Sequence, residues 1–130
     1  MFVLDTNSLI HFFKGQGHVG ELLLEIPPSE IGVPAIVQYE LEVGIAKSSS
    51  PKKRQKQLGE LIELVNLLPF GEAEAHAAAT LRATLEKRGK PIGPIDTLIA
   101  GTALANRAVL VTHNAREFGR VPGLEVVDWY

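Results

Sequence analysis

The sequence contains no cysteine. Disulfide bonds, a thiol nucleophile and cysteine-ligated zinc are therefore excluded, which leaves carboxylates, hydroxyls, basic groups and four histidines for any chemistry. No apolar run approaches the roughly 18 residues that a membrane-spanning helix needs. The N-terminus also lacks the basic start and apolar stretch of a signal peptide. We therefore expect a cytoplasmic protein with no membrane segment.

Several common catalytic signatures are missing as well. There is no GxSxG motif of a serine hydrolase, and neither GxGxxG nor GxxxxGK[ST] of the usual nucleotide-binding loops. The histidines show no HxxxH or HxH spacing, which argues against a zinc site. They are His11, His18, His76 and His113.

Charge of one sign is nearly balanced by the other, with 13 Lys and Arg against 15 Asp and Glu. A wholly basic surface for nucleic acid is therefore absent, but positive charge gathers locally. Between Glu42 and Glu60 there is no acid, and the interval holds Lys47, Lys52, Lys53, Arg54 and Lys56. This interval is either a solvated helix face or a surface that contacts phosphates.

The length of 130 residues and the 45% hydrophobic content predict one domain spanning residues 1–130. Short apolar runs predict strands at 2–4, 31–33, 67–70, 109–111 and 126–127. Helical spacing predicts helices after the polar turn 5–8 and at 19–26, 35–46, 57–65, 72–88 and 95–106, with a short turn at 116–118. Strands that alternate with helices indicate an α/β sandwich with a parallel sheet.

The predicted helix 35–46 has a mixed pattern. Ile36, Tyr39, Val43 and Ala46 share one face of it. Glu40 lies within the same helix, where its carboxylate either faces solvent or points into a cleft.

Acids and amides follow the predicted strands at one edge of the sheet. Asp5 comes directly after the first strand, Asp96 lies in the first turn of its helix, and Thr112 to Asn114 follow the fourth strand. If the first and fourth strands are neighbours, these groups meet, because the carboxyl ends of parallel strands share one edge. Each acid also has a plainer interpretation: Asp5 as a helix cap, Asp96 as a helix-dipole partner, and Glu40 and Glu117 as surface acids.

The set of acids is more informative than any member of it. Three or four carboxylates at one edge repel one another and raise each other's pKa unless a cation neutralises them. Hard divalent metals prefer such oxygen ligands. The pattern therefore predicts a divalent metal site.

Five segments in order resemble the PIN-domain ribonucleases, and within them the VapC toxins of bacterial toxin–antitoxin pairs. The segments are Leu4-Asp5-Thr6-Asn7, Tyr39-Glu40-Leu41 with Gly44, Gly93 to Ala100, Val111 to Asn114 with Arg116-Glu117-Phe118, and Val121 to Leu124 with Asp128-Trp129. The resemblance implies a three-layer PIN-like sandwich whose parallel strands have the order 3-2-1-4-5.

The resemblance also implies a site. The family's metal-binding acids fall on Asp5, Glu40 and Asp96. Many members carry an aspartate where this chain has Asn114, so we assign the fourth acidic role to Glu117 and keep Asn114 as a supporting group. This departure leaves open how many metal ions the site holds.

The implied activity is hydrolysis of an RNA phosphodiester by a water activated by Mg²⁺ or Mn²⁺. Thr6 would orient Asp5 or a phosphate oxygen, and Lys52, Lys53 and Arg54 would contact phosphates of the flanking stem. The implied target is structured cellular RNA, most often a tRNA anticodon loop. The implied partners are a second copy of the chain, a VapB-type antitoxin and, through the antitoxin complex, operator DNA.

Two alternatives remain at this point. A metal-dependent phosphatase of the haloacid dehalogenase type needs a second aspartate two residues after the first, where this chain has Asn7. A non-catalytic PIN-fold module that only binds RNA would be expected to lose acids, yet Asp5, Glu40 and Asp96 are present.

Overall fold

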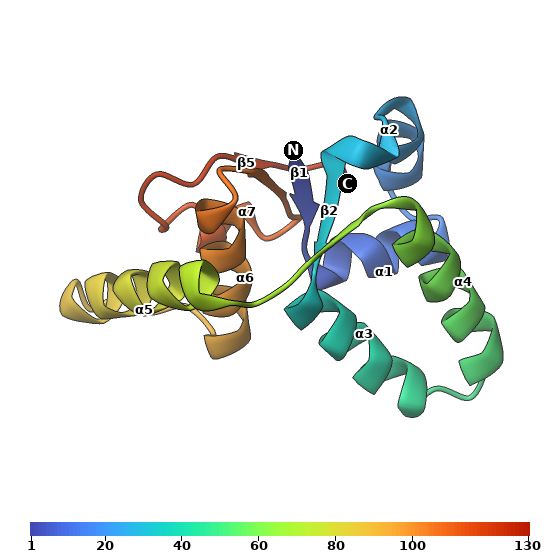
Figure 1. Ribbon diagram of the computed structural model, residues 1–130, viewed down its shortest axis with the longest axis horizontal. Coiled ribbons are helices and arrows are strands. Elements are labelled where there is room, and N and C mark those ends of the chain that lie inside the picture. The colour runs from blue at the N-terminus through green and yellow to red at the C-terminus, as the bar shows by residue number, and fades with distance from the viewer.

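A computed structural model describes all residues from 1 to 130, and a parallel sheet of five strands forms its centre (Figure 1). β1 (Phe2–Leu4) is the middle strand, with β2 (Ile31–Pro34) on one side and β4 (Val109–Val111) on the other. β3 (Asn66–Leu68) and β5 (Val126–Val127) are the edge strands. The order β3-β2-β1-β4-β5 confirms the expected topology.

Helices connect and flank these strands. In Figure 1, α1 to α4 lie to the right of the central strands and α5 to α7 to the left. Their bounds are α1 Thr6–Lys14, α2 Val19–Glu25, α3 Ala35–Ala46, α4 Pro51–Leu64, α5 Glu72–Lys87, α6 Pro94–Ala105 and α7 Ala115–Phe118, with a 3₁₀ turn at Pro28–Glu30. None of them is long and apolar enough to span a bilayer.

β1 and its neighbour β4 are fully buried toward their carboxyl ends. Val3, Leu4, Leu110 and Val111 have no exposed surface. Strands buried on both faces consist of continuous apolar residues, which explains why short apolar runs identified them in the sequence. Because β1 and β4 are parallel neighbours, the residues that follow Leu4 and Val111 emerge at the same edge of the sheet.

The face of α3 that packs on the core consists of Val37, Leu41 and Ile45. The other apolar face is largely open to solvent, with Tyr39 58% and Val43 38% exposed. Because α3 is apolar on both faces, periodicity alone did not distinguish the buried face from the exposed one.

Three predicted boundaries were wrong. α1 begins at Thr6, inside the expected polar turn 5–8, because Asp5 caps the helix. α4 begins at Pro51, six residues before the expected start at Gln57, because proline fits the first turn of a helix. The basic interval at residues 52–56 is therefore helical. β3 spans Asn66–Leu68 and not 67–70, since Pro69 cannot continue the ladder of hydrogen bonds.

Candidate functional site

Asp5 stands where β1 ends and α1 begins. Its Oδ1 atom accepts a hydrogen bond of 2.9 Å from the Ser8 amide, so the helix-cap interpretation is correct. The residue is only 4% exposed. The hydrogen bond from the Ser8 amide therefore holds this buried carboxylate in one orientation at the carboxyl edge of the sheet.

Glu40 points back toward α1 from the middle of α3. The Thr6 hydroxyl donates a hydrogen bond to its Oε1 atom. The Thr6 hydroxyl is thus engaged by Glu40 and not by Asp5, and its expected contact with a phosphate oxygen stays a prediction. Glu42 is exposed, as the two-residue spacing on a helix requires.

Glu117 binds the backbone of the loop that precedes α6. Its Oε1 atom accepts a 2.9 Å hydrogen bond from the Gly93 amide, and its Oε2 atom accepts one of 2.7 Å from the Asn114 side chain. A Cβ atom at Gly93 would lie 3.6 Å from Asp96 Oδ2 and 3.9 Å from Glu117 Oε1. Gly93 thus lies directly against both carboxylates, and its amide is a part of the site that sequence reasoning missed.

Asp96 has the largest electrostatic perturbation of these acids. Burial, a hydrogen bond with Glu117 and the charges of Glu117, Asp5 and Glu40, in decreasing order of effect, together raise its pKa to about 7. The expected repulsion among acids at one sheet edge is therefore present. Near pH 7 Asp96 is therefore about half protonated, and its protonated carboxyl donates a hydrogen bond to Glu117.

Glu117 shows the opposite behaviour. The hydrogen bond from the Gly93 amide lowers the pKa of Glu117, against a smaller effect of burial that raises it, and hydrogen bonds from Asp96 and Asn114 lower it too. Two neighbouring carboxyls with pKa values shifted in opposite directions share one proton between them.

Asp5, Glu40 and Glu117 lie close enough to Asp96 to raise its pKa. No three acidic or histidine side chains are yet positioned to share one metal ion. The donor set consists of carboxylate oxygens, which suits a hard divalent cation. Such a cation would supply the positive charge that the shared proton now supplies. The residues present therefore fit a divalent metal ion by their chemistry.

The pKa of Asp96 makes stability depend on pH. Its folded value of about 7 lies above the ordinary 3.8, so the folded state holds its proton over a range where the unfolded state has lost it. The stability from this group is complete below about pH 4 and is lost as the pH rises through about 7.

Metal-free protein should therefore lose about 1 to 2 kcal/mol between pH 5 and pH 8, after the full shift of roughly 4 kcal/mol is discounted for solvent screening. Asp96→Asn should flatten that dependence, and Mg²⁺ should stabilise the protein more at pH 8 than at pH 5. Urea unfolding at both pH values measures these differences; the same slope in Asp96→Asn as in the unmodified protein would contradict the assignment to Asp96.

The basic interval divides into two parts. Lys52 and Lys53 are exposed on the first turn of α4. Arg54 is half-buried, and its Nη1 atom donates hydrogen bonds to the Phe13 carbonyl at 3.4 Å and to Gln57 Oε1 at 3.0 Å. Arg54 thus connects α4 to the end of α1, whereas the side chains of Lys52 and Lys53 are available for contacts with phosphates.

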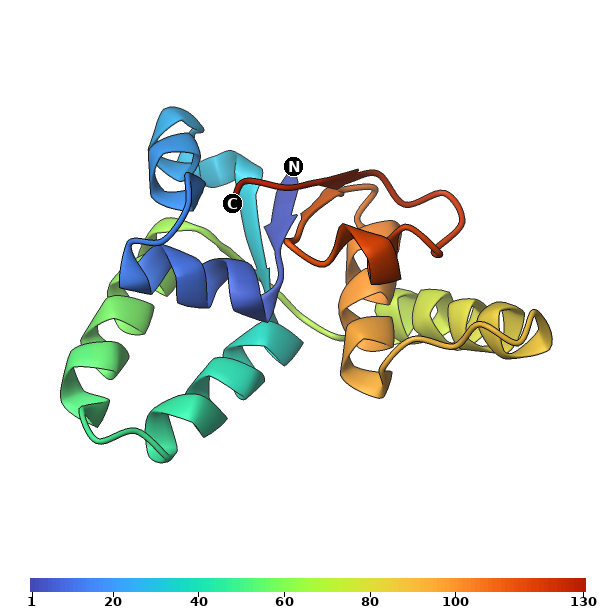
Figure 2. The ribbon, with the colours of Figure 1, turned by 180° about the vertical axis from the view of Figure 1, so that it is seen from behind.

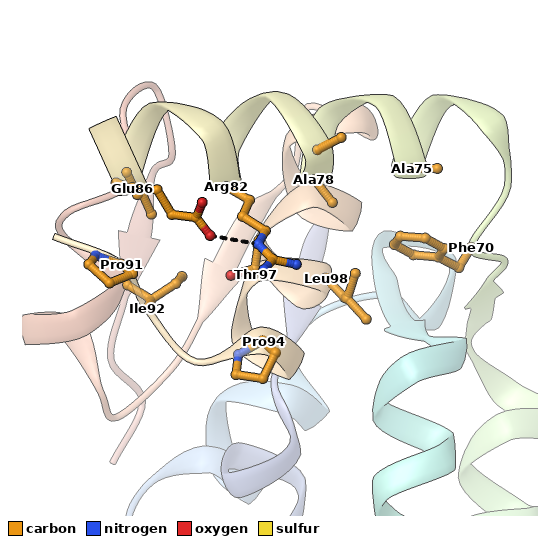
Figure 3. A pocket seen from close by; sticks show the side chains of 12 residues that line it. Phe70, Ala75, Ala78, Arg82, Glu86, Pro91, Ile92, Pro94, Thr97 and Leu98 are labelled. Atoms are coloured by element: carbon orange, nitrogen blue, oxygen red, sulfur yellow. Dashed lines mark hydrogen bonds and ion pairs between the residues drawn. The ribbon is translucent and has the colours of Figure 1, made fainter. Parts of the chain in front are cut away.

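A hollow of about 550 Å³ lies away from the four acids (Figure 3). It is lined mainly by apolar side chains from α5, α6 and the loop between them, including Ala78, Ile92 and Leu98. Arg82 and Glu86 form a 2.8 Å ion pair at its wall (Figure 3). None of the four candidate acids lines this hollow, so size alone would have misplaced the site.

Comparison with known proteins gives a consistent result. Residues 2–124 match the PIN domain family. The tRNA(fMet)-specific endonuclease VapC of Salmonella typhimurium is 34% identical over 98% of this chain and 97% of its own length. The ribonuclease VapC2 of Rickettsia felis is 31% identical over 99% of this chain and 98% of its own length.

Solved structures agree with this result. The crystal structure of VapBC2 from Rickettsia felis bound to a promoter DNA fragment superposes with a TM-score of 0.92 at 30% identity, covering 99% of this chain and 98% of that chain. The DNA-bound VapBC of Salmonella typhimurium gives the same TM-score at 34% identity, again over 99% and 98% of the two chains. The chain belongs to the PIN-domain family, among its VapC ribonucleases.

Proposed function

We propose that the protein is a metal-dependent endoribonuclease toxin whose Asp5, Glu40 and Asp96 hold Mg²⁺ or Mn²⁺. Glu117 is the fourth acid. The observation that carries this proposal is the gathering of four acids at one edge of the sheet, where burial, a hydrogen bond with Glu117 and the charges of the other three acids raise the pKa of Asp96 to about 7. Four carboxylates placed to repel one another are costly to folding unless a cation is bound.

The metal would activate a water molecule and stabilise the negative charge that develops on the phosphoryl group. The chain's own residues keep the ligands in place. The Ser8 amide fixes Asp5, the Thr6 hydroxyl fixes Glu40, and Glu117 holds the Gly93 amide next to Asp96. These hydrogen bonds restrict the motion of the carboxylates, so that less reorientation is needed when they close around an ion.

The proposed substrate is structured cellular RNA, with a tRNA anticodon loop as the first candidate. Support comes from the VapC of Salmonella typhimurium, which is named a tRNA(fMet)-specific endonuclease. Unpaired loop nucleotides can splay outward to reach an acidic site, whereas a paired stem cannot.

The proposed partners are a VapB-type antitoxin, operator DNA reached only through the antitoxin complex, and a second copy of the chain. Support comes from similar chains that were solved as VapBC complexes with DNA. An antitoxin that blocks the acids would explain how a cell tolerates the ribonuclease.

The proposal is tested by digestion of total tRNA with the purified protein at increasing Mg²⁺ or Mn²⁺, followed by sequencing of the new RNA ends. We expect cleavage that requires the metal, stops on chelation and yields ends within one loop. Cleavage that is unaffected by a chelator would contradict a metal mechanism. RNA that is bound but never cut would favour the non-catalytic module.

The exposed lysines of α4 supply a separate prediction. Lys52→Ala with Lys53→Ala should weaken RNA binding similarly for all sequences and reduce the slope of log affinity against log salt by roughly 1 to 2, because each phosphate contact releases counterions. Lys87→Ala with Lys90→Ala removes the same charge at the far end of α5 and is the matched control. Filter binding at several salt concentrations measures the slope; equal slopes for both pairs would identify Lys52 and Lys53 as a solvated face.

Arg54 is best substituted separately. Its side chain holds the Phe13 carbonyl, so Arg54→Ala removes a contact between α4 and α1 together with a charge. A loss of RNA binding in that variant alone would report on the helix contact rather than on phosphates.

A further inference from the structure

Two exposed rings stack on each other beside the acids. The ring centroids of His113 and Tyr130 are 4.2 Å apart, with 26° between the planes. The side chain of His113 is 49% exposed and Tyr130 is 46% exposed. Neither residue has a role in the site described above.

Asp128 holds the two rings together. Its Oδ2 atom is 2.9 Å from His113 Nδ1, and its Oδ1 atom accepts a 2.9 Å hydrogen bond from the Tyr130 amide. Burial raises the pKa of Asp128, but the hydrogen bonds from the Tyr130 amide and His113 outweigh it and leave the pKa below its usual value. The Asp128 carboxylate is therefore charged around neutral pH, where it keeps its contacts with both His113 and Tyr130.

The segment that carries Tyr130 is fixed at several further points. Trp129 is buried, and its ring packs on Phe2 at 5.2 Å. The His18 amide donates to the Trp129 carbonyl at 3.0 Å. A Cβ atom at Gly17, whose φ is +65°, would lie 2.9 Å from the Tyr130 backbone, so only glycine permits this approach. The rings are thus rigid although they are exposed.

The backbone places His113 near the acid site, because the Asp5 amide donates a 3.2 Å hydrogen bond to the carbonyl of Val111, two residues before it. His113 directly precedes Asn114, whose side chain holds Glu117. The edge of His11 packs on Tyr130 at 4.7 Å, and His11 lies on α1, the helix that starts next to Asp5. In Figure 2 the C-terminal segment crosses the central strands close to the N-terminus and ends on the side where α1 and α2 lie. A nucleotide next to a scissile phosphate at the acids would pass these rings.

We propose that the stacked pair of His113 and Tyr130 is a platform on which one unpaired nucleobase of the RNA stacks. The inference rests on the proposed ribonuclease activity. Asp128, which contacts both ring residues, is negatively charged and repels phosphates, so the rings are suited to hold an uncharged group of the RNA. A nucleobase is such a group, and a rigid aromatic face binds it whatever its sequence, at little cost in entropy.

The test uses hairpin RNAs that carry one 2-aminopurine, each at a different loop position, because stacking quenches its fluorescence. All variants are made in an Asp96→Asn background, so that the RNA stays intact. Tyr130→Phe keeps the flat ring, whereas Tyr130→Leu keeps apolar bulk without it. Leu24→Ala, at a residue that is 84% exposed on α2, is the surface control.

We expect binding to quench the probe at one loop position in the parent, the Phe variant and the control. The Leu variant should lose that quenching and bind roughly 5- to 140-fold more weakly, the range that stacking of one base predicts. Its salt slope should be unchanged, because no phosphate contact is lost. His113→Ala should also bind more weakly, because it removes half of the stack.

Equal quenching and affinity in the Leu variant at every loop position would overturn the platform. The ribonuclease would stand in that case, provided that the protein with its natural Asp96 still cuts tRNA. Intact RNA binding together with weaker binding of an antitoxin peptide would assign the pair to a protein contact and would also overturn it. If the Asp96→Asn parent did not bind hairpins and the protein with its natural Asp96 did not cut tRNA, both proposals would be refuted.

Discussion

Asp5→Asn and Asp96→Asn should each lower the rate of RNA cleavage by at least about 100-fold at saturating Mn²⁺. A metal ion's stabilisation of the developing charge contributes several kcal/mol, and an amide cannot replace a carboxylate's charge in holding the metal. Asn preserves the size of the side chain and leaves an oxygen that can accept the Ser8 hydrogen bond at position 5. Single-turnover cleavage of tRNA measures the loss.

Glu42→Gln is the matched control, because Glu42 is exposed on the same helix as Glu40 and its substitution removes one negative charge outside the site. It should cleave at a normal rate. The double variant of Asp5 and Asp96 should be little slower than either single variant, since ligands of one ion act as a unit. Undiminished cleavage by the folded double variant would refute the mechanism. Loss of cleavage together with loss of the circular dichroism signal would identify the acids as structural caps.

The pattern of apolar runs was sufficient to predict a parallel sheet and to place Asp5 directly after its first strand, whereas the strand order came from the resemblance to the PIN-domain family. Runs such as Val109 to Val111 consist only of apolar residues because both faces of the middle strands are covered. Once β1 and β4 are neighbours, Asp5 and Asn114 must come out at the same edge. Local composition and the rules of parallel sheets therefore determine that much.

The role of Glu40 could not be derived from periodicity. α3 is apolar on both faces, and Glu40 and Glu42 flank the buried Leu41. Which glutamate points inward depends on how α3 packs against α1, which is a tertiary contact between residues 34 positions apart in the chain. Only the resemblance to a known family selected Glu40 in advance.

The contribution of Gly93 was missed for a similar reason. Its amide donates to Glu117, which lies 24 residues further along the chain, and a backbone amide leaves no signature in a sequence. The available signal was the sequence Gly93-Pro94 before Asp96, which predicts a rigid entry to the helix but not an amide that faces a carboxylate. The Thr6 hydroxyl was assigned to Asp5 or a phosphate oxygen because the sequence does not show that Glu40 lies next to it.

Glu117→Gln should raise the Mn²⁺ concentration needed for half-maximal cleavage roughly 10- to 100-fold, the range found for residues that support metal ligands. Gln retains an oxygen that can accept the hydrogen bond from Gly93, so the loop before α6 keeps its shape while one negative charge is lost. The pKa of Asp96 should fall in the same variant, because the hydrogen bond and the charge of Glu117 both raise it. Carboxyl NMR across pH 5 to 8 measures that fall without requiring activity.

Asn114→Ala is the matched comparison. It removes the 2.7 Å hydrogen bond to Glu117 Oε2 but no charge, so the Mn²⁺ requirement should rise less than about 10-fold. If Asn114 itself filled the fourth position, its Ala variant would shift the Mn²⁺ curve while Glu117→Gln left it normal, and the two assignments would have to be exchanged. The structure favours Glu117, because the Asn114 amide group donates toward that carboxylate, and the carboxylate in turn shares the proton of Asp96. The negative charge of Glu117, which raises the pKa of Asp96, would also attract a bound cation. Loss of that charge should therefore raise the Mn²⁺ requirement more than loss of the hydrogen bond from Asn114 that orients the carboxylate.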